Sequence, residues 1–450
     1  MRSLDDLASA PRHAVAICGA AVSGAEAAAA FAARGIAAIV FEQNARPYGK
    51  IEDGLPRWHE ALRNQEYERI DENLAREGVY FVPETLIGRD LGVDELRAFG
   101  LNAVILANGA WRDRALDLPG VDAYVDKGLV YQNPFVYWFN HYEDPGYAGP
   151  RYEVSDGAIV VGGGLASVDV IKILNIELYR AALARRGHVI DVVELEHGGI
   201  AKTLEKLGIT REELGVRGCT LYYRRRVMDM PLASPKDDTP EALAKTQKVR
   251  EKMVQILAQK FFTRVVDCHL PVRALVEGGR LVGLAFKRTE VRDGKLLTLP
   301  DAEVEVRAPL VVSSIGSVPR AVPGIPMKGE LYDFADWDTG ALRGLTGVFG
   351  LGNVLTGKGN IKDSRENSRD VSGRVLRDYL GVGEADGPDP MAAAHAAARE
   401  RADAAAAGVR RAEPVGVERL RAVADAVRRR WQAVGYQGDY RAWIGRHRPA

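Results

Sequence analysis

The chain has 450 residues, and its 61 lysines and arginines balance 61 aspartates and glutamates. The length allows two or three domains, and the balanced charge excludes a uniformly basic protein that coats nucleic acid, so any basic site must be local. Three widely separated cysteines, Cys18, Cys219 and Cys268, form no CxxC pair. Their spacing excludes a disulfide framework, a cysteine-ligated cluster and a thioredoxin-type redox pair, and a reducing, cytoplasmic setting fits best.

An apolar segment at residues 14–33 is long enough to imitate a signal peptide or a membrane span. However, Glu26 lies inside it, glycines interrupt it, and a second strand-like run follows directly. We therefore predict a strand, a glycine turn and a helix here, and no membrane partner.

The same segment carries a first nucleotide-binding motif. An apolar strand is followed by a glycine turn, an alanine-rich helix and a second strand that ends in Glu42. In a dinucleotide fingerprint, glycines form the tight turn and the helix–strand contact, and an acid about 20 residues further on binds the ribose hydroxyls. Gly19, Gly24 and Glu42 fill these roles, whereas Ala21 replaces the middle glycine and adds a methyl group where phosphate should come closest.

A second fingerprint lies far downstream. Gly162 and Gly164 follow an apolar strand, Leu165 and Ala166 begin a helix, and Ser167 takes the third small-residue position. Two such motifs in one chain, each after a strand and before a helix, are stronger evidence for nucleotide binding than either motif alone.

Three adjacent arginines, 224–226, follow an apolar run that begins at Cys219. In a Rossmann unit the end of the second strand faces the adenosine ribose, where an acid favours a free 2′-hydroxyl and an arginine accommodates a 2′-phosphate. Glu42 therefore favours FAD in the first site, and Arg224 with Arg225 favours NADPH in the second. Arg226 points the other way on an extended chain and is not assigned. The alternative is that these arginines are a solvated strand end.

Arg224 lies 62 residues after Gly162, which is too far for a minimal Rossmann unit. Residues 185–217 must therefore form an insertion. We predict that the insertion is helical, because residues 210–213 read Thr-Arg-Glu-Glu, a capping box.

Together these motifs resemble the adrenodoxin-reductase-like flavoproteins and, more loosely, the small subunit of glutamate synthase. The resemblance covers about residues 12 to 380, and its ordered motifs are RPYGKIEDGLPRWH (46–59), NPFVYWFNHYE (133–143), GGGLASVD (162–169), YRRRVMDMP (223–231) and GLGNVLTGKGNIKDS (350–364). Because the first strand starts near His13, we do not expect the cysteine-rich, cluster-binding extension of glutamate-synthase small subunits.

The resemblance implies an α/β fold with two Rossmann-like domains, in which the NADPH-binding domain is inserted into a discontinuous FAD-binding domain. We expect the FAD-binding domain at residues 1–118 and 308–381, the NADPH-binding domain at 119–307, and a C-terminal linker and helical extension at 382–450. Apolar strands within 101–111 and 308–319 would be the two crossings between the domains.

The resemblance also implies site residues. For FAD they are Gly19, Ala21, Gly24, Glu42, Gly109, Gly352, Asn353, Gly359, Asn360 and Ile361, and for NADPH they are Gly162, Gly164, Leu165, Ala166, Arg224 and Arg225. His59 would handle a proton near the flavin and Asp169 would orient the nicotinamide. The alternatives are a packed or surface histidine, and an acid in the first turn of a helix that complements its dipole. Ala21, Asn108 and Asn353 depart from the family pattern.

The activity implied by the resemblance is hydride transfer from NADPH to the flavin, followed by electron release to a ferredoxin-like protein or a larger subunit. A glutamate-synthase-type electron-input subunit is one alternative. Another is a degenerate relative that binds nucleotide, or nothing, and serves as a regulatory or assembly partner. No metal site is expected, and a homodimer is open.

Two further regions remain. The aromatic residues between 131 and 147 lack the basic neighbours that nucleic-acid stacking requires, so interdomain packing is preferred. In the tail, helices are expected at 391–407 and around 417–434, the second with an apolar stripe and several arginines. The tail either docks on the body or a dimer mate, or presents a positive landing face to an acidic electron carrier.

Overall fold

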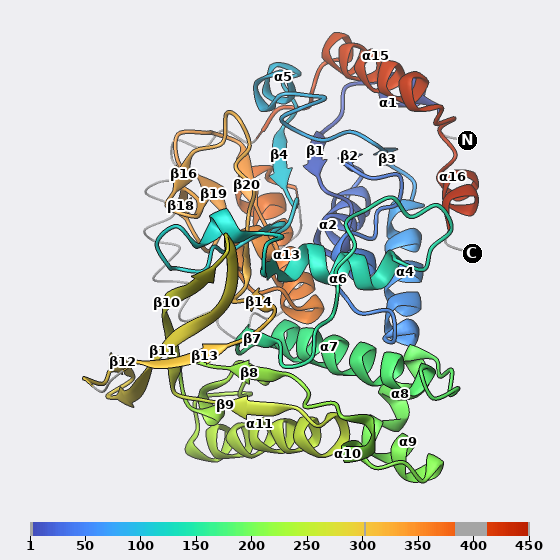
Figure 1. The fold of residues 1–450 in the computed structure, drawn as a ribbon. Coiled ribbons are helices and arrows are strands. Elements are labelled where there is room, and N and C mark those ends of the chain that lie inside the picture. Colours follow the sequence, from blue (N-terminus) through green and yellow to red (C-terminus); the bar gives the residue numbers. More distant parts are fainter. Residues whose placement is uncertain (1–2, 301–302, 383–411, 449–450) are drawn as a thin grey trace. The chain divides into compact units, whose positions relative to one another are not determined.

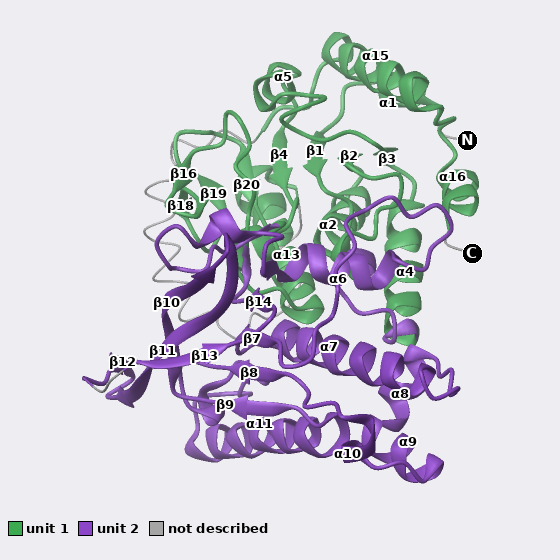
Figure 2. Ribbon diagram, viewed as in Figure 1, with its two compact units in different colours: residues 1–51, 61–111, 318–450 green, residues 52–60, 112–317 purple. Residues whose placement is uncertain are grey.

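The structure is a computed structural model that describes residues 3–300, 303–382 and 412–448. The chain divides into two compact units (Figure 2): unit 1 comprises residues 1–51, 61–111 and 318–450, and unit 2 comprises residues 52–60 and 112–317. Unit 1 is therefore discontinuous, and unit 2 is inserted into it. The divisions at 111/112 and 317/318 differ from the expected boundaries at 118/119 and 307/308, so residues 112–118 and 308–317 belong to unit 2. Residues 52–60 also belong to unit 2 instead of the N-terminal part.

Unit 1 is built on a seven-stranded sheet with the order β18-β19-β20-β4-β1-β2-β3 (Figure 1). The five strands from β20 to β3 are parallel, and β18 and β19 add an antiparallel edge. Strands β1 to β4 are buried along their whole length, which is typical of parallel strands covered on both faces. The bounds are β1 Ala14–Cys18, β2 Ala37–Phe41, β3 Val79–Val82, β4 Ala103–Leu106, β18 Phe334–Asp336, β19 Ala341–Leu342 and β20 Val348–Gly350.

Small residues let the main helices of unit 1 pack closely. Helix α2 is rich in alanine, and Ser23 Oγ donates to Ser364 O over 3.2 Å while Ser368 Oγ donates to Ser23 O over 2.7 Å, which joins α2 to α13. The remaining elements are α1 Leu4–Leu7, α2 Val22–Ala32, α3 Lys50–Asp53, α4 Glu60–Leu74, α5 Val93–Ala98, β16 Met327–Lys328, β17 Leu331–Tyr332, α12 Asn353–Thr356, α13 Ile361–Arg374, a π-helical turn Val375–Tyr379, α15 Val417–Val434 and α16 Tyr440–His447.

Residues 14–33 form β1 and α2, as predicted, and no described helix combines the length and apolarity that a membrane crossing needs.

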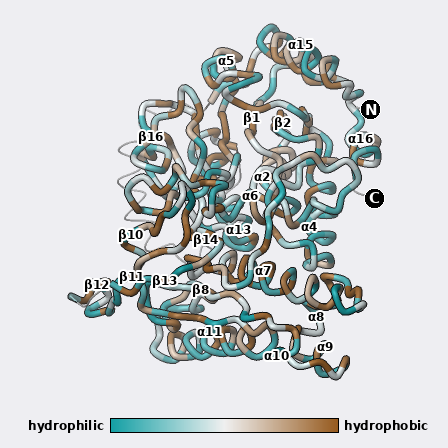
Figure 3. Tube along the Cα trace, in the orientation of Figure 1, coloured by the Kyte–Doolittle hydropathy of each residue, from teal (hydrophilic) through white to brown (hydrophobic). Residues whose placement is uncertain are grey.

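The C-terminal helix α15 packs on unit 1 with one apolar face. Leu420, Val423, Val427 and Trp431 are buried in the same core as the strands of the seven-stranded sheet. Hydrophobic and hydrophilic residues alternate along α15 in Figure 3, as expected for a helix with one buried face. Helix α15 therefore docks on the body of the chain. The other predicted tail helix, 391–407, lies outside the described residues.

Unit 2 contains a five-stranded parallel sheet with the order β6-β14-β7-β8-β9, and an antiparallel sheet in which β11 pairs with β10, β12 and β13. The parallel strands are β6 Leu129–Tyr131, β7 Ile159–Gly162, β8 Thr220–Tyr222, β9 Arg264–Val266 and β14 Val311–Ser314. The antiparallel strands are β10 His269–Glu277, β11 Arg280–Arg292, β12 Lys295–Thr298 and β13 Val304–Arg307. Two parallel-sheet units in one chain confirm the predicted fold class.

The predicted insertion is helical. In its capping box, Thr210 N donates to Glu213 Oε2 over 2.6 Å and Glu213 N donates to Thr210 Oγ1 over 3.3 Å, as the sequence indicates. The helices of unit 2 are α6 Gln132–His141, α7 Leu165–Ala184, α8 Val192–Gly198, α9 Ile200–Leu207, α10 Arg211–Leu214 and α11 Pro240–Phe261, with 3₁₀ turns at Val121–Tyr124 and Val227–Asp229 and short strands β5 Arg112–Asp113 and β15 Ser317–Val318.

The aromatic run forms helix α6, and much of it packs inside unit 2. Phe135, Trp138 and Phe139 belong to the core of unit 2, together with Trp58 from the 52–60 segment. Burial of apolar surface within unit 2 therefore accounts for these three rings of α6.

Candidate functional site

The first glycine loop joins β1 to α2, and two of its positions admit only glycine. Gly19 has a φ of 103°, and a Cβ atom there would lie 2.6 Å from the carbonyl oxygen of Ala107. A Cβ atom at Gly24 would lie 1.8 Å from the carbonyl oxygen of Gly19. The turn and the helix–strand contact therefore depend on these two residues, as a dinucleotide-binding loop requires.

The alanine at the middle position of this loop lies next to a glycine, which leaves room for the alanine methyl group. Ala21 is the N-cap of α2, and a Cβ atom at Gly49 would lie only 2.9 Å from the Ala21 methyl carbon. Gly49 also has a φ of 52°. The methyl group that departs from the fingerprint is thus accommodated by a glycine from the next segment, and both residues line one cavity.

Glu42 follows the carboxyl end of β2, and its side chain is held beside the glycine loop. The residue is buried, with Oε2 accepting from Ala20 N over 2.9 Å and Oε1 accepting from Asn44 N over 3.0 Å. The two amide donors fix the carboxylate at the carboxyl edge of the sheet, where open α/β sheets bind ligands.

A cavity in unit 1 brings most of the expected FAD residues together. Gly19, Ala21, Glu42, Gly109, Asn353, Gly359, Asn360 and Ile361 line it. Gly24 and Gly352 do not line it and instead support the packing: a Cβ atom at Gly352 would lie 2.1 Å from Ser23 Oγ. Sequence reasoning did not single out other lining residues, among them Tyr48, Thr85, Trp111 and Ser364. Tyr48 and Ser364 lie within the motifs 46–59 and 350–364, whereas no quoted motif covers Thr85 or Trp111.

Two asparagines leave buried oxygens unpaired in this cavity. Asn108 Nδ2 donates to Tyr332 Oη over 2.9 Å, but Asn108 Oδ1 and Asn353 Oδ1 are buried and have no hydrogen-bond partner among the described residues. Buried polar atoms in native proteins are nearly always satisfied. A flavin nucleotide carries N–H and O–H donors, so the residues fit a bound FAD.

The N-terminus of α13 also faces the cavity. Asn360 caps this helix by accepting from Asp363 N over 2.7 Å, and both Asn360 and Ile361 line the cavity. The first turn of a helix concentrates positive partial charge, which favours an anionic or electron-rich group nearby.

In unit 2 the second glycine loop joins β7 to α7. A Cβ atom at Gly162 would lie 2.4 Å from the carbonyl oxygen of Ser314, and one at Gly163 would lie 2.2 Å from the ring of Tyr223. Gly164, the N-cap of α7, has no atom within 4 Å of its Cβ position. Leu165 begins α7 and is 45% exposed. The middle glycine therefore opens onto free space at the start of a long helix, where a pyrophosphate can bind.

The side chains of Arg224, Arg225 and Arg226 differ in the hydrogen bonds and ion pairs that they form within the protein. Strand β8 lies beside β7 in register, with Tyr222 opposite Val161, so Arg224 and Arg225 follow the strand next to the glycine loop. Arg225 Nη2 donates to the carbonyl oxygen of Gly294 over 2.9 Å, and Arg226 makes two 2.9 Å bonds to Asp229.

Within the described part of the chain, no carboxylate lies within ion-pair distance of Arg224, and the residue is exposed. Arg224 and Arg225 are therefore placed to bind an anion, whereas Arg226 is already neutralised by Asp229. Tyr223, which packs on Gly163, was missed by sequence reasoning.

His59 and Asp169 come together within unit 2. His59 Nε2 lies 3.7 Å from Asp169 Oδ1, and their side chains are 34% and 19% exposed. Asp169 is the fifth residue of α7, so it lies in the second turn and not in the first. The expected position of Asp169 in the first turn of the helix is therefore wrong, and helix-dipole effects, which fade beyond the first turn, contribute little there.

A buried lysine supports the segment that carries His59. Lys172 follows Asp169 by one turn of α7, forms an ion pair with Glu196, and has its Nζ 4.9 Å from the centroid of the Trp58 ring. A cation over the face of an indole ring is favourable, more so when both are desolvated. Lys172 was missed, although a lysine inside an apolar helical stretch is a recognisable signal.

Polar contacts hold the 52–60 segment to α6. Asn140 Nδ2 donates to the carbonyl oxygens of Glu52 and Leu55 over 2.8 and 3.0 Å. His141 Nε2 lies 3.2 Å from Asp53 Oδ1, and its Nδ1 lies 2.7 Å from Asp144 Oδ2. Burial of the His141 ring works to lower its pKa, but hydrogen bonds and charge from the two aspartates outweigh the burial and raise the pKa above its ordinary value.

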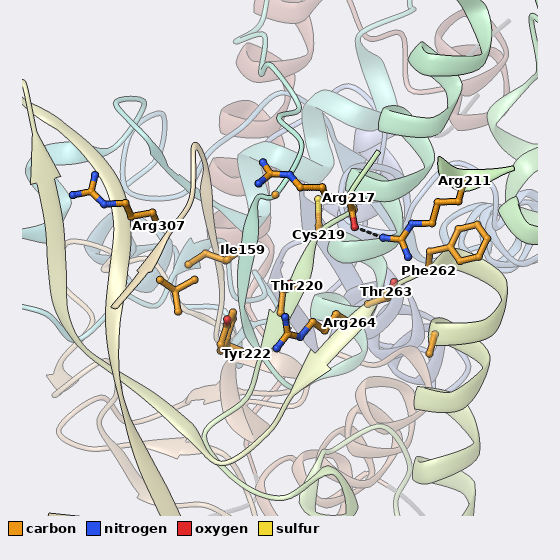
Figure 4. Close-up of a pocket in the computed structure, with 14 residues that line it drawn as sticks. Ile159, Arg211, Arg217, Cys219, Thr220, Tyr222, Phe262, Thr263, Arg264 and Arg307 are labelled. Carbon is orange, nitrogen blue, oxygen red and sulfur yellow. Dashed lines mark hydrogen bonds between the residues drawn. The ribbon is translucent and has the colours of Figure 1, made fainter. Parts of the chain in front are cut away.

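A separate cavity of about 570 Å³ lies at the amino ends of β7 and β8 (Figure 4). Four arginines line it, and carboxylates neutralise two of them: Arg307 Nη2 lies 2.6 Å from Glu277 and Arg217 Nε lies 3.4 Å from Asp156. The others are Arg211 and Arg264. Because the glycine loop is at the opposite end of the strands, this cavity is not part of the nucleotide site. No group of three or more potential metal ligands occurs in the described residues.

Several known proteins are similar to this chain in sequence. No family model matches it. It is 25% identical over 226 residues to the mitochondrial NADPH:adrenodoxin oxidoreductase of Arabidopsis thaliana, a match that covers 47% of this chain and 44% of that protein. It is 24% identical over 376 residues to the NADPH-ferredoxin reductase FprA of Mycobacterium leprae, which covers 78% of each. It is 32% identical over 160 residues to the glutamate synthase [NADPH] small chain of Bacillus subtilis, which covers 35% and 31%.

The chain thus spans less than half of the Arabidopsis protein, but most of the Mycobacterium leprae protein. In fold, it is similar to the solved structure of Mycobacterium tuberculosis FprA in complex with NADPH, with a TM-score of 0.62, 19% identity, and coverage of 92% of this chain and 99% of that one. These matches confirm the resemblance predicted from the motifs. By sequence and by fold, the chain is a relative of the adrenodoxin reductases, ferredoxin reductases and glutamate synthase small chains.

Proposed function

We propose that this chain is an FAD-dependent oxidoreductase that takes hydride from NADPH and passes electrons to a ferredoxin-like carrier protein. One observation carries the proposal: the residues that follow the strand beside each glycine loop have opposite charges in the two units. A buried carboxylate, Glu42, follows β2 in unit 1, whereas two available guanidiniums, Arg224 and Arg225, follow β8 in unit 2. An acid selects an unphosphorylated ribose and arginines select a 2′-phosphate, so one chain holds a site for each dinucleotide.

In unit 1, the residues of the cavity would hold FAD. Glu42 would accept hydrogen bonds from the ribose hydroxyls, and the backbone between Gly19 and Ala21 and the amides that begin α13 would supply donors to the rest of the cofactor. Asn108 Oδ1 and Asn353 Oδ1, which have no partner in the part of the chain that the structure describes, would supply two of the acceptors. When bound, the flavin supplies two-electron acceptance and stepwise release.

In unit 2, the N-terminus of α7 would bind the pyrophosphate of NADPH at the open side of Gly164, while Arg224 and Arg225 bind the 2′-phosphate. Asp169 Oδ1 lies 3.7 Å from His59 Nε2, close enough for its charge to act on the imidazole. The family resemblance supports a proton-handling role for His59 during flavin reduction.

Flavin absorption, and its loss on reduction by NADPH, test this proposal directly. The purified protein, supplied with FAD, should show a flavin absorption band that bleaches on anaerobic addition of NADPH, and the reduced protein should pass electrons to added ferredoxin. A protein that stays colourless with excess FAD would contradict the proposal and favour the degenerate, regulatory alternative.

A second candidate is an electron-input subunit of the glutamate synthase type. The 32% identity to the Bacillus subtilis small chain, higher than to the two reductases, favours it. A large subunit that co-purifies in equal stoichiometry from native cells would support this candidate, whereas fast turnover with ferredoxin alone would support the first.

A further inference from the structure

The C-terminal helices contact the loop that lines the cavity of unit 1. Arg430 of α15 donates from Nε to Thr85 Oγ1 over 3.0 Å and from Nη2 to the carbonyl oxygen of Glu84 over 2.6 Å. The next residue, Trp431, donates from Nε1 to the carbonyl oxygen of Phe81 over 2.9 Å. One turn of the tail therefore binds β3 and the loop that follows it.

This loop is directly joined to the ribose-binding acid. Thr85, which is 1% exposed and lines the cavity, donates from its backbone N to the carbonyl oxygen of Glu42 over 2.7 Å. Glu84 N donates to the carbonyl oxygen of Asn44 over 3.2 Å. Glu84 also has a φ of 48°, a conformation that costs free energy in a non-glycine residue and persists only where its surroundings hold it.

Helix α16 contacts the other wall of the cavity through one carboxylate. Asp71 of α4 accepts from Tyr440 Oη over 2.7 Å, from Arg448 Nη2 over 3.0 Å and from Tyr48 Oη over 3.2 Å. Tyr48 is fully buried, lines the cavity and precedes Gly49, which accommodates the Ala21 methyl group. Asp71 therefore connects the end of the chain to the glycine loop.

From these contacts we propose that α15 and α16 set the affinity for FAD by positioning the residues around its adenosine half. Arg430 fixes the 84–85 loop and hence the main chain of Glu42, and Asp71 fixes Tyr48 against the glycine loop. Arg430 is a positioning residue that acts through this loop. The inference rests on the proposed FAD site and concerns how tightly that site holds its cofactor.

The same contacts engage part of the basic surface of the tail, whereas Arg419, Arg421 and Arg429 are exposed. Besides Arg430, Arg428 is engaged, with Nη2 3.0 Å from Asp5 and Nη1 2.5 Å from Asp425. Part of the expected basic surface is therefore used inside unit 1.

The test is FAD binding by Arg430→Ala in the full-length apoprotein, measured by quenching of flavin fluorescence. We expect the Kd for FAD to rise about tenfold, because charge-assisted hydrogen bonds that hold the loop are lost. At saturating FAD, the flavin absorption spectrum and midpoint potential should match the wild type, because the contacts of Arg430 are with the 84–85 loop and, over 3.8 Å, with Asp90. Arg430→Lys keeps one cationic donor and should restore part of the affinity.

Arg429→Ala is the matched control, because Arg429 is exposed on the same helix beside Arg430. It should leave the Kd unchanged. Tyr440→Phe, which removes only a hydroxyl group, provides a second variant if Arg430→Ala does not fold, and it should also weaken FAD binding.

The failures of the two proposals are distinguishable. If the wild type binds FAD and the variants have a lower apoprotein Tm but an unchanged Kd, the tail only stabilises the fold and this inference is overturned. If the wild type itself binds no FAD, the proposed function fails and this inference falls with it.

Discussion

His59 Nε2 lies 3.7 Å from Asp169 Oδ1, and this contact joins two segments that lie far apart in the sequence. His59 belongs to the short segment 52–60, which unit 2 takes from the N-terminal part of the chain, and Asp169 belongs to the second turn of α7. The relationship gives the histidine a defined neighbour at the start of the helix that carries the second glycine loop.

We therefore expect His59→Gln and Asp169→Asn to slow flavin reduction by NADPH. The loss should be about 10²-fold for His59→Gln, the lower end of general acid–base effects, and smaller for Asp169→Asn. Stopped-flow absorbance under anaerobic conditions measures it. If the aspartate acts through the histidine, the double variant should be no slower than His59→Gln, so additive losses would contradict the pairing.

Arg224→Gln and Arg225→Gln should each weaken the binding of NADPH and leave the binding of NADH unchanged. Each loses a charge-assisted contact of about 1.5–3 kcal/mol with the 2′-phosphate, so KM for NADPH should rise roughly 10- to 100-fold while KM for NADH stays the same. Arg226→Gln is the control, since Asp229 already binds that guanidinium through two 2.9 Å bonds. An unchanged preference between the two coenzymes would remove the basis for assigning NADPH to unit 2.

Gly49→Ala should destabilise unit 1 by two separable effects. Its φ of 52° disfavours any side chain by about 1–2 kcal/mol, and its new methyl group would lie 2.9 Å from the Ala21 methyl carbon. Adding Ala21→Gly should recover only the second part.

The control is Gly35→Ala, with a φ of 71° and open space around its Cβ position, which should show the conformational cost alone. Chemical denaturation measures all four proteins. Equal losses for Gly49→Ala and Gly35→Ala would mean that the Ala21 contact relaxes at no cost.

The stability of unit 2 should fall as the pH rises past neutrality. The pKa of His141 is raised in the folded state by Asp53 and Asp144, which outweigh the effect of burial. Its contribution is therefore complete below the unfolded pKa and is lost as the pH rises through the higher, folded one. Urea midpoints at pH 6 and pH 8.5 should differ in the wild type and differ less in His141→Gln. Equal pH dependence in both proteins would assign the effect to other groups.

Local patterns in the sequence were enough to predict both glycine loops, and the family resemblance implied the fold class. A strand, a glycine turn, a helix and a residue at the next strand end lie within a short stretch, so Gly19, Glu42 and Gly164 could be assigned from spacing alone. The capping box at Thr210 and the buried stripe of α15 are likewise local. Residues that are close in the sequence determine turns, helix caps and hydrophobic periodicity, so these features can be predicted without knowledge of tertiary contacts.

The contacts that complete the site depend on the tertiary structure. The membership of 52–60 in unit 2, the gap at Gly49 that accepts the Ala21 methyl group, and the bonds from Arg430 to the 84–85 loop all join distant segments. Contacts between distant segments follow no fixed spacing in the sequence, because they depend on which surfaces meet when the helices pack on the sheet. The sequence by itself determined which nucleotide-binding loops exist, and only the packing of distant segments decided which side chains surround them.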